Sequence, residues 1–372
     1  MSKYLMLDVG AGTLDMLYYD DESGLHYKAV VKSPVLTVAE KARRLQGNLL
    51  VSGTEMGGGP VSEILIARAR EFQVLMTPSA ALTLHHDLER VKASGIRVVD
   101  ESEAAALGAT GRYGNLTLGD LEIPRLRGLV ESFGVPFSFD FVGVCAQDHG
   151  MPPPGISHLD FRHSLFKLSL DRDPFPHALL YAREEIPAPL NRLKSIAESA
   201  AELPAHEVYV MDSGMAAILG GSLDPQAISK ERIIVLDLAT SHTLGAALEE
   251  GEIAGFFEYH TRDMTLQKLE SLVVELAEGA LVHEKILQQG GHGAYVRKAF
   301  GFDRSEILLA TGPKRRLLSK SRLPIRPGAP FGDHMMTGTA GLLEAIRASP
   351  APASWVRRGE LPGSPPPASP MA

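Results

Sequence analysis

Cysteine is almost absent from this chain, whose 372 residues include only Cys145. A single thiol forms no intrachain disulfide, no cysteine zinc site and no iron–sulfur cluster, because each of these needs several thiolates. The sequence therefore argues against radical chemistry on a cysteine-ligated cluster, and it favours a reducing compartment.

Long apolar runs and an excess of basic residues are absent as well. No run is long enough to span a bilayer, and residues 1–10 lead straight into a predicted strand without the apolar core of a signal peptide. The formal net charge is −8, whereas duplex binding normally uses a basic face. We expect a cytoplasmic protein that binds neither a membrane nor nucleic acid.

What remains is the composition of a large globular protein. Hydrophobic residues make up 44% and charged residues 22% of the chain, and a chain of this length allows roughly two domains, each with its own core. Residues 349–372 depart from this composition. They are rich in Pro, Ser and Ala and are predicted to form a disordered tail.

The most informative segment is Leu5 to Tyr19, which reads LMLDVGAGTLDMLYY. An apolar strand ends in Asp8, passes through a glycine-rich turn and returns as a second apolar strand, which predicts a β-hairpin. Glycine lets the backbone approach a ligand closely, and a nearby carboxylate can hold the metal that shields a phosphate. A tight hairpin without a ligand is the alternative.

A second segment, Arg232 to Leu248, repeats this pattern as RIIVLDLATSHTLGAAL, with Asp237 in the place of Asp8. A third short strand is predicted after each hairpin, over Leu25 to Val31 and over Glu252 to Tyr259, and a helix follows it. The chain therefore reads as two copies of one module.

The two hairpins resemble the phosphate loops of the superfamily of actin, hexokinase-type sugar kinases and the large heat-shock chaperones. The resemblance implies a two-lobed, actin-like α/β ATPase fold, that is a duplicated ribonuclease H-like fold with mixed sheets, whose lobes clamp Mg-ATP. It implies that Asp8 and Asp237 hold the metal and that Asp15 supports the first loop. The phosphates would lie between Gly10, Ala11, Gly12 and Thr13 on one side and Thr240, Ser241, His242 and Thr243 on the other.

Three further elements of the superfamily have matches. The first connecting helix corresponds to Val208 to Gly221 and the second to Gly338 to Ile346. Leu50 to Pro60 and Asp100 to Ala109 are interpreted as first-half counterparts of the adenosine loop and of the second connecting helix. The adenosine loop itself corresponds to Glu306 to Arg316, with four expected nucleotide contacts: Thr311, Gly312, Pro313 and Lys314.

Two carboxylates are candidate catalytic residues. In the superfamily, the residue at the start of the first connecting helix faces the attacking water or the phosphoryl acceptor, and here that residue is Asp212. A role for Asp212 as helix N-cap is compatible with this. The second candidate is Asp148, which closely follows the apolar strand Phe139 to Val144.

The Pro- and His-rich residues 149–189 are predicted to be an insertion that forms the substrate face. A metal site there would need imidazole and carboxylate groups to meet, although their spacing matches no known metal motif. Polar groups satisfied within loops are the alternative. The side chains concerned are Asp148, His149, His158, Asp160 and His163.

Two smaller features add to this. Gly57 to Gly59 precede Pro60 and a helical stretch, so their free N–H groups favour an anion, and a flexible turn is the alternative. His85 and His86 lie on a helical pattern and are interpreted as surface or cap residues.

The chain as a whole also resembles an uncharacterised bacterial and archaeal group labelled as similar to a pyruvate-formate-lyase-activating protein. The motifs that carry this resemblance are DVGAGTLD near the start, EMGGGP at Glu55 to Pro60, CAQDHG at Cys145 to Gly150 and ATGP at Ala310 to Pro313.

We therefore predict a first lobe over residues 1–224, with the insertion at about 149–189, a second lobe over 225–348 and a tail over 349–372. The predicted function is binding of a nucleotide, ATP with Mg²⁺, in the cleft between the lobes. Hydrolysis coupled to lobe closure and a protein partner is one form of it. A kinase for a small metabolite and an inactive fold used for binding are the alternatives.

Overall fold

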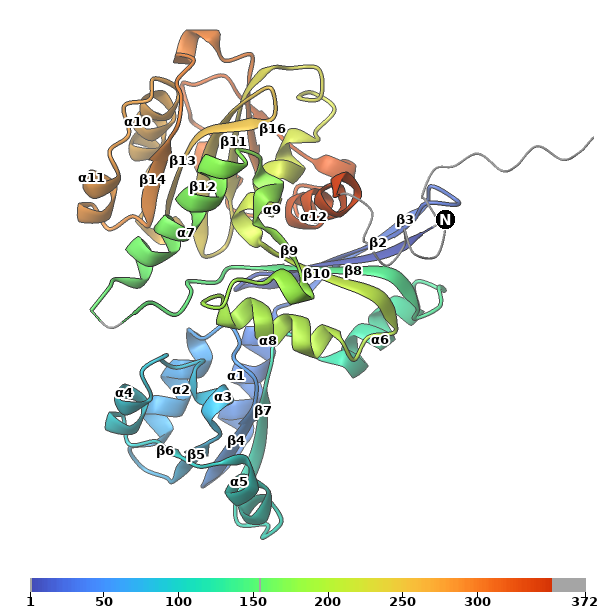
Figure 1. The fold of residues 1–372 in the computed structure, drawn as a ribbon, viewed down its shortest axis with the longest axis vertical. Coiled ribbons are helices and arrows are strands. Elements are labelled where there is room, and N and C mark those ends of the chain that lie inside the picture. Colours follow the sequence, from blue (N-terminus) through green and yellow to red (C-terminus); the bar gives the residue numbers. More distant parts are fainter. Residues whose placement is uncertain (1, 154, 350–372) are drawn as a thin grey trace, which may run out of the picture.

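A computed structural model describes residues 2–153 and 155–349 of this protein. Three β-sheets follow one another along its long axis (Figure 1). Of the predicted tail, only Ser349 belongs to the described residues, and residues 350–372 lie outside them.

The sheet of the first lobe begins with an antiparallel unit of three strands. The first strand of that unit then pairs in parallel with a strand far along the chain, and an antiparallel strand closes the edge. Its order is β3 (His26–Lys32), β2 (Thr13–Asp20), β1 (Lys3–Val9), β8 (Phe139–Ala146), β10 (Ala205–Asp212) and β9 (Leu180–Ala182).

The sheet of the second lobe repeats this plan, with one extra strand beside the antiparallel unit instead of at the other edge. Its order is β14 (Gly293–Val296), β13 (Glu252–His260), β12 (His242–Glu249), β11 (Arg232–Leu238), β15 (Ile307–Thr311) and β16 (Ile325–Pro327). The same unit of three antiparallel and two parallel strands thus occurs twice. The predicted two-lobed, actin-like fold is confirmed.

A third sheet, which the sequence did not predict, lies within the first 120 residues. Its four strands are all parallel and enclose a separate apolar core with α1 and α2. Figure 1 shows it at the end of the molecule remote from the second lobe. Its order is β6 (Arg97–Val98), β5 (Val74–Met76), β4 (Leu49–Gly53) and β7 (Gly114–Leu118).

This third sheet corrects the interpretation of Leu50 to Pro60 and Asp100 to Ala109. β4 and α5 (Glu101–Gly108) belong to it and are not counterparts of β15 and the last helix. The counterpart of β15 is β8, because each lies parallel to the first strand of its own hairpin. A strand followed by glycines occurs in any parallel α/β sheet, so the local pattern misled.

Two helices cross between the large sheets: α9 (Ser213–Ser222) and α12 (Thr337–Ala348) (Figure 1). Their backbones touch, since a Cβ on Gly220 would lie 1.8 Å from the carbonyl oxygen of Thr337, and one on Gly341 would lie 1.9 Å from that of Ala216. Both predicted connecting helices are therefore present. The first begins at Ser213, because the residues before it complete β10.

Among the remaining helices, α7 contributes Phe166 and Leu170 to the apolar core that α9 and α12 share between the large sheets, and α7 and β9 lie within the predicted insertion. Among the described residues, no helix has both the length and the apolar composition to cross a bilayer. The division into lobes at residue 224 stays a prediction. These helices are α1 (Pro34–Arg44), α2 (Pro60–Arg68), α3 (Pro78–Ala81), α4 (Leu88–Ala93), α6 (Ile123–Ser132), α7 (His158–Arg172), α8 (Asn191–Ala200), α10 (Leu266–Ala277) and α11 (His283–Gln288).

Candidate functional site

The tips of both hairpins are closed by the same hydrogen bond. In the first, the N–H of Gly10 donates to the carbonyl oxygen of Thr13 at 3.0 Å. In the second, the N–H of Ala239 donates to the carbonyl oxygen of His242, also at 3.0 Å. Each bond spans a four-residue turn between antiparallel strands, so the two turns share one hydrogen-bond pattern.

A hydroxyl residue directly after the third strand anchors each tip. Ser33 donates its hydroxyl to the carbonyl oxygen of Gly10 at 2.6 Å, and its N–H to the carbonyl two residues further on at 3.1 Å. Thr261 donates in the same way to Ala239 at 2.9 Å and to the second carbonyl at 2.8 Å. Neither anchor was predicted from the sequence, although the position of a hydroxyl residue directly after the third strand is a usable signal.

The two tips meet each other across the lobes. A Cβ added to Gly12 would lie 3.0 Å from both Oγ1 and Cγ2 of Thr240. Thr240 therefore lies next to Gly12, and the two acidic-ended hairpins point at one place.

Both tips line one cavity of about 630 Å³ between the lobes. Four predicted residues lie outside its lining, namely Asp212, Thr243, Thr311 and Lys314. The predicted residues that line it are Asp8, Gly10, Ala11, Gly12, Thr13, Asp15, Asp148, Asp237, Thr240, Ser241, His242, Gly312 and Pro313.

Three of the predicted residues outside the cavity lining make hydrogen bonds to residues in or beside the second hairpin. The hydroxyl of Thr311 is fully buried and donates to Oδ1 of Asp237 at 3.1 Å. Thr243 shares a hydrogen bond of 3.0 Å with the hydroxyl of Thr261, and the N–H of Lys314 donates to the carbonyl oxygen of Leu238 at 2.9 Å. These bonds position the second hairpin.

Asp8, Asp15 and Asp237 form an acidic group at the cavity. Burial raises the pKa of Asp8 to about 7, and the negative charge of Asp237 adds to this rise. Burial, followed by the charge of Asp8, raises the pKa of Asp15 to about 8. Burial raises the pKa of Asp237 to about 6. Because like charges in a partly dehydrated site repel one another, a bound cation would stabilise the ionised form of these three carboxylates.

These residues fit a magnesium ion. Oδ1 of Asp15 is buried without a hydrogen-bond partner among the described residues, and both Asp8 and Asp237 reach the cavity. Carboxylate oxygens are the protein ligands that Mg²⁺ prefers, together with water and phosphate oxygens.

Asp212 is held in a buried ion pair with Arg162, which also pairs with a carboxylate of the second lobe. Nη2 of Arg162 donates to Oδ2 of Asp212 at 2.9 Å, and Nη1 of Arg162 donates to Glu258 in β13. Oδ1 of Asp212 accepts the N–H of Met215 at 3.1 Å, which caps α9. Burial raises the pKa of Asp212, and the charge of Arg162 opposes the rise. The carboxylate of Asp212 is thus committed to a cap and an ion pair.

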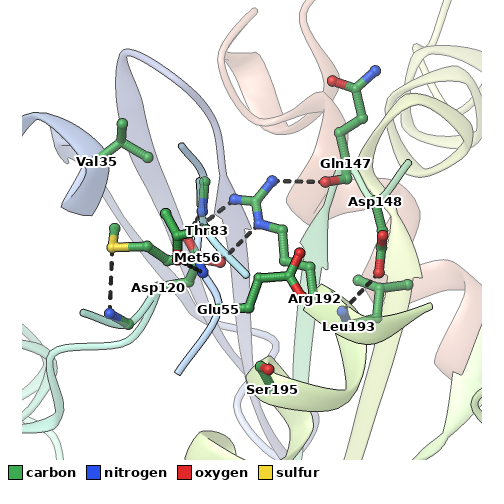
Figure 2. Close-up of polar contacts among 12 residues, drawn as sticks. Val35, Glu55, Met56, Thr83, Asp120, Gln147, Asp148, Arg192, Leu193 and Ser195 are labelled. Atoms are coloured by element: carbon green, nitrogen blue, oxygen red, sulfur yellow. Dashed lines mark hydrogen bonds and ion pairs between the residues drawn. The ribbon is translucent and has the colours of Figure 1, made fainter. Parts of the chain in front are cut away.

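Asp148 is also committed to backbone groups. Its Oδ1 accepts the N–H of Gly150 at 2.8 Å and its Oδ2 accepts the N–H of Leu193 at 3.0 Å. Figure 2 shows this second bond beside Arg192, whose guanidinium lies between Asp120 and the backbone of residue 147. Arg192 binds both oxygens of Asp120, at 2.8 and 3.0 Å. These two bonds attach the loop between β7 and α6, which carries Asp120, to helix α8, which carries Arg192.

A second polar group lines the cavity on the side of the third sheet. Nε2 of His86 lies 2.7 Å from Oε1 of Glu55, and Nδ2 of Asn191 donates to Oε2 of Glu55 at 2.7 Å. The hydrogen bond to Glu55 raises the pKa of His86. His85 and His86 lie in the loop before α4, not on a helix, and Asp87 caps α4. A local helical pattern could not reveal this pairing.

The five acidic and histidine side chains around the insertion do not converge. The ring of His158 lies 5.6 Å from that of His86, whereas His163 stacks on His283 at 3.8 Å. Asp160 also faces His283. Asp148 binds backbone N–H groups, and His149 turns toward other histidines of the second lobe. The ring contacts of the three histidines and the side-chain partner of Asp160 lie outside the insertion, although Nδ1 of His158 lies 3.3 Å from the carbonyl oxygen of Gly150 within it. The spacing within the insertion therefore did not predict these contacts.

The sequence of residues 56–317 matches a protein family described as "Putative pyruvate format-lyase activating enzyme (DUF1786)". The chain belongs to this DUF1786 family. No curated protein matches the sequence.

Three of the solved structures similar to this DUF1786 chain are 9–11% identical to it in sequence. The ethanolamine utilization protein EutJ from Carboxydothermus hydrogenoformans has 10% identity and a TM-score of 0.30, with 92% of this chain and 89% of that one covered. AlfA from a B. subtilis plasmid, in a filament, has 9% identity and a TM-score of 0.36, covering 92% and 98%. The ROK hexokinase from Thermus thermophilus has 11% identity and a TM-score of 0.30, with 93% of this chain and 100% of that one covered.

Proposed function

We propose that the cavity between the lobes binds a nucleotide with Mg²⁺, and that ATP is this nucleotide. The observation that supports the proposal is the meeting of two acidic-ended hairpins, from the two copies of one module, at a single cavity. Backbone N–H groups in tight turns bind phosphate oxygens, and the nearby carboxylates suit the accompanying metal.

In this proposal the two tips hold the phosphates and the carboxylates hold the ion. Thr13 and Thr240 contribute hydroxyl donors, and Asp8 and Asp237 hold hydrated Mg²⁺, which neutralises the phosphate charge. Gly312 and Pro313, which line the cavity after β15, face the nucleoside. Gly312 has a φ of +83°, which favours glycine and leaves bare backbone at that point.

Turnover requires a rearrangement at Asp212. Asp212 would orient the attacking water, but both of its oxygens are engaged, by Met215 and by Arg162. Hydrolysis coupled to lobe closure therefore requires Arg162 to release Asp212, and a protein partner acting on the lobes is one means of doing so. A fold that binds nucleotide without turnover is the alternative.

A second candidate function is phosphorylation of a small metabolite, because the cavity extends past the hairpins to Glu55 and His86. A carboxylate and an imidazole 2.7 Å apart can bind and orient an acceptor hydroxyl. Phosphoryl transfer depends on such positioning and on charge neutralisation.

The activity in the family's description does not fit these residues. The chain has one cysteine, and Cys145 is fully buried in β8, with Asp8 beside it. A cysteine-ligated iron–sulfur cluster needs several thiolates.

Isothermal titration of the full chain with ATP, ADP and GTP, with and without Mg²⁺, tests the proposal. We expect ATP to bind more tightly with Mg²⁺, and Asp8→Asn to remove that difference. Asp303→Asn, at an exposed carboxylate in a short helix before β15, is the matched control and should bind as the wild type does. Equal affinities for Asp8→Asn and wild type would refute the role of Asp8.

Phosphate release and metabolite-dependent ADP release then separate the three forms of the proposal. Phosphate release that a protein partner stimulates supports an ATPase, and ADP release that needs an added metabolite supports a kinase. Binding with neither supports the inactive form. In the kinase form, Glu55→Gln should raise the KM for the metabolite without changing nucleotide affinity.

A further inference from the structure

Three histidines from separate segments gather beside the second hairpin tip. His149 follows β8 of the first lobe, His242 begins β12, and His292 precedes β14. One ring nitrogen from each lies within 4.8 Å of the corresponding nitrogens of the other two. No two of them are close in sequence, so only the fold brings them together.

One of these histidines carries a buried nitrogen atom without a partner. Nε2 of His242 is buried and makes no hydrogen bond among the described residues, whereas Nδ1 of His292 faces Glu258 and leaves Nε2 of His292 for a ligand. His292 itself is only 6% exposed. A buried polar atom without a partner destabilises the folded state, so such an atom in a native protein points to a ligand.

We propose that His149, His242 and His292 bind one divalent transition-metal ion of the zinc class, and that this ion joins the two lobes. Imidazole nitrogen suits Zn²⁺, Ni²⁺ and Cu²⁺, whereas Mg²⁺ prefers oxygen, so this site is chemically distinct from the acidic group at Asp8 and Asp237. Because His149 is on the first lobe and the other two are on the second, the ion is a cross-link at the edge of the cavity.

The distances allow such a site after small rotations of the rings. Zn–N bonds of about 2.0–2.1 Å in a tetrahedron place the nitrogens roughly 3.4 Å apart, compared with separations of up to 4.8 Å here. A fourth imidazole is at hand, since Nε2 of His260 lies 3.2 Å from Nε2 of His292. His260 or a water molecule completes the tetrahedron.

A charged group already orients one ligand from behind. Oε1 of Glu258 lies 3.7 Å from Nδ1 of His292, and Glu258 is held in place by Arg162 and by Gln147, whose Nε2 donates to it at 2.6 Å. Metal-bound histidines commonly face a carboxylate in this way, which fixes the ring. Glu258 is a positioning residue here.

The test uses the full chain, stripped with a chelator and titrated calorimetrically with ZnCl₂ in buffer free of nucleotide and Mg²⁺. We expect one equivalent to bind with a Kd below about 1 μM, and His149→Gln and His242→Gln each to weaken binding by about 100-fold or more. His206→Gln is the control, because His206 is 64% exposed and pairs with Asp140. The control should bind as the wild type does.

Thermal melts and Co²⁺ spectra test the same metal site by two further measurements, in case a variant folds poorly. Zn²⁺ should raise the Tm of the wild type and of His206→Gln, but not that of the His149→Gln/His242→Gln double variant. Co²⁺ in the wild type should give the absorption bands of a tetrahedral nitrogen site. No binding by the wild type, a six-coordinate Co²⁺ spectrum, or equal losses in His206→Gln and His242→Gln would overturn the proposal. None of these measurements depends on nucleotide binding.

Discussion

Thr240, at the tip of the second hairpin, lies directly against Gly12, at the tip of the first. Gly12→Ala would bring its new Cβ to 3.0 Å from Oγ1 of Thr240, so the Thr240 side chain or one of the two tips has to move. Overpacking of this kind costs about 1–3 kcal/mol. We expect urea unfolding of Gly12→Ala to show a loss of stability of about 1 kcal/mol or more.

A double-mutant cycle tests that the loss comes from the contact between the tips. Thr240→Ala in the Gly12→Ala background should recover stability, with a coupling energy above about 0.5 kcal/mol. Gly128→Ala is the control, because Gly128 lies in α6 with open space around it. It should stabilise the protein by up to about 1 kcal/mol. Additive effects of the two tip substitutions would contradict the contact.

Arg162 is predicted to be the most sensitive charged residue of the cleft. Its side chain is 6% exposed and neutralises both Asp212 and Glu258. Burial opposes the charge of Arg162 at Glu258, but that charge outweighs burial and holds the pKa of the Glu258 carboxyl well below its ordinary value. Arg162→Met leaves two buried carboxylates without the positive charge that neutralises them, so we expect a loss of about 3–5 kcal/mol in urea unfolding.

Removing the two negative charges as well should recover much of that stability. In Arg162→Met/Asp212→Asn/Glu258→Gln none of the three side chains is charged, and the amide oxygen introduced at position 212 can still cap α9. Arg262→Met, at an 80% exposed arginine, is the control and should change stability by less than about 0.5 kcal/mol. A triple variant as unstable as Arg162→Met would show that the charges are not the cause.

The pair of His86 and Glu55 predicts a pH dependence of stability. The hydrogen bond to Glu55 and the charges of Glu55 and Asp148 raise the pKa of His86 above 6.5, against the effect of burial. The folded state therefore holds the proton more tightly than the unfolded chain. The added stability is complete below pH 6.5, and it is lost as the pH rises through the folded pKa.

Thermal unfolding between about pH 6 and pH 9 measures this loss. The stability difference between wild type and His86→Gln should shrink as the pH rises. Glu55→Gln should flatten the same slope, because it removes the partner that holds the proton. The nearby ring of His158, 5.6 Å from that of His86, carries no negative charge that could replace the carboxylate of Glu55. Equal slopes for wild type and both variants would contradict the pairing.

Cys145 should report on opening of the protein. Its thiol is fully buried, and burial together with the charge of Asp8 raises its pKa well above the ordinary value. Since the thiolate is the reactive form, we expect almost no reaction with a thiol reagent at neutral pH and full reaction in urea. Comparison with glutathione under the same conditions gives the protection factor. Labelling at the glutathione rate would place Cys145 at the surface.

Short-range patterns were enough for the hairpins and for the duplication. Each pair of strands is joined by a turn of a few residues, so the strands and the turn residues lie within one short stretch of sequence. Asp8 and Asp237 occupy equivalent positions in the two stretches. The third sheet was missed because its strands have only two to five residues and pair with segments 20 or more residues away. Nothing local distinguishes such strands from loops.

Two acidic-ended turns, a single cysteine and a duplicated unit are visible in the sequence, because each depends on composition or on neighbouring residues. Which groups meet depends on how the distant parts of the chain pack: Gly12 with Thr240, Arg162 with Glu258, and His149 with His292. These partners are far apart in the chain, and no residue type or spacing fixes their approach. It is the packing of α9 against α12 between the sheets that sets it, and that contact depends on glycines at Gly220 and Gly341.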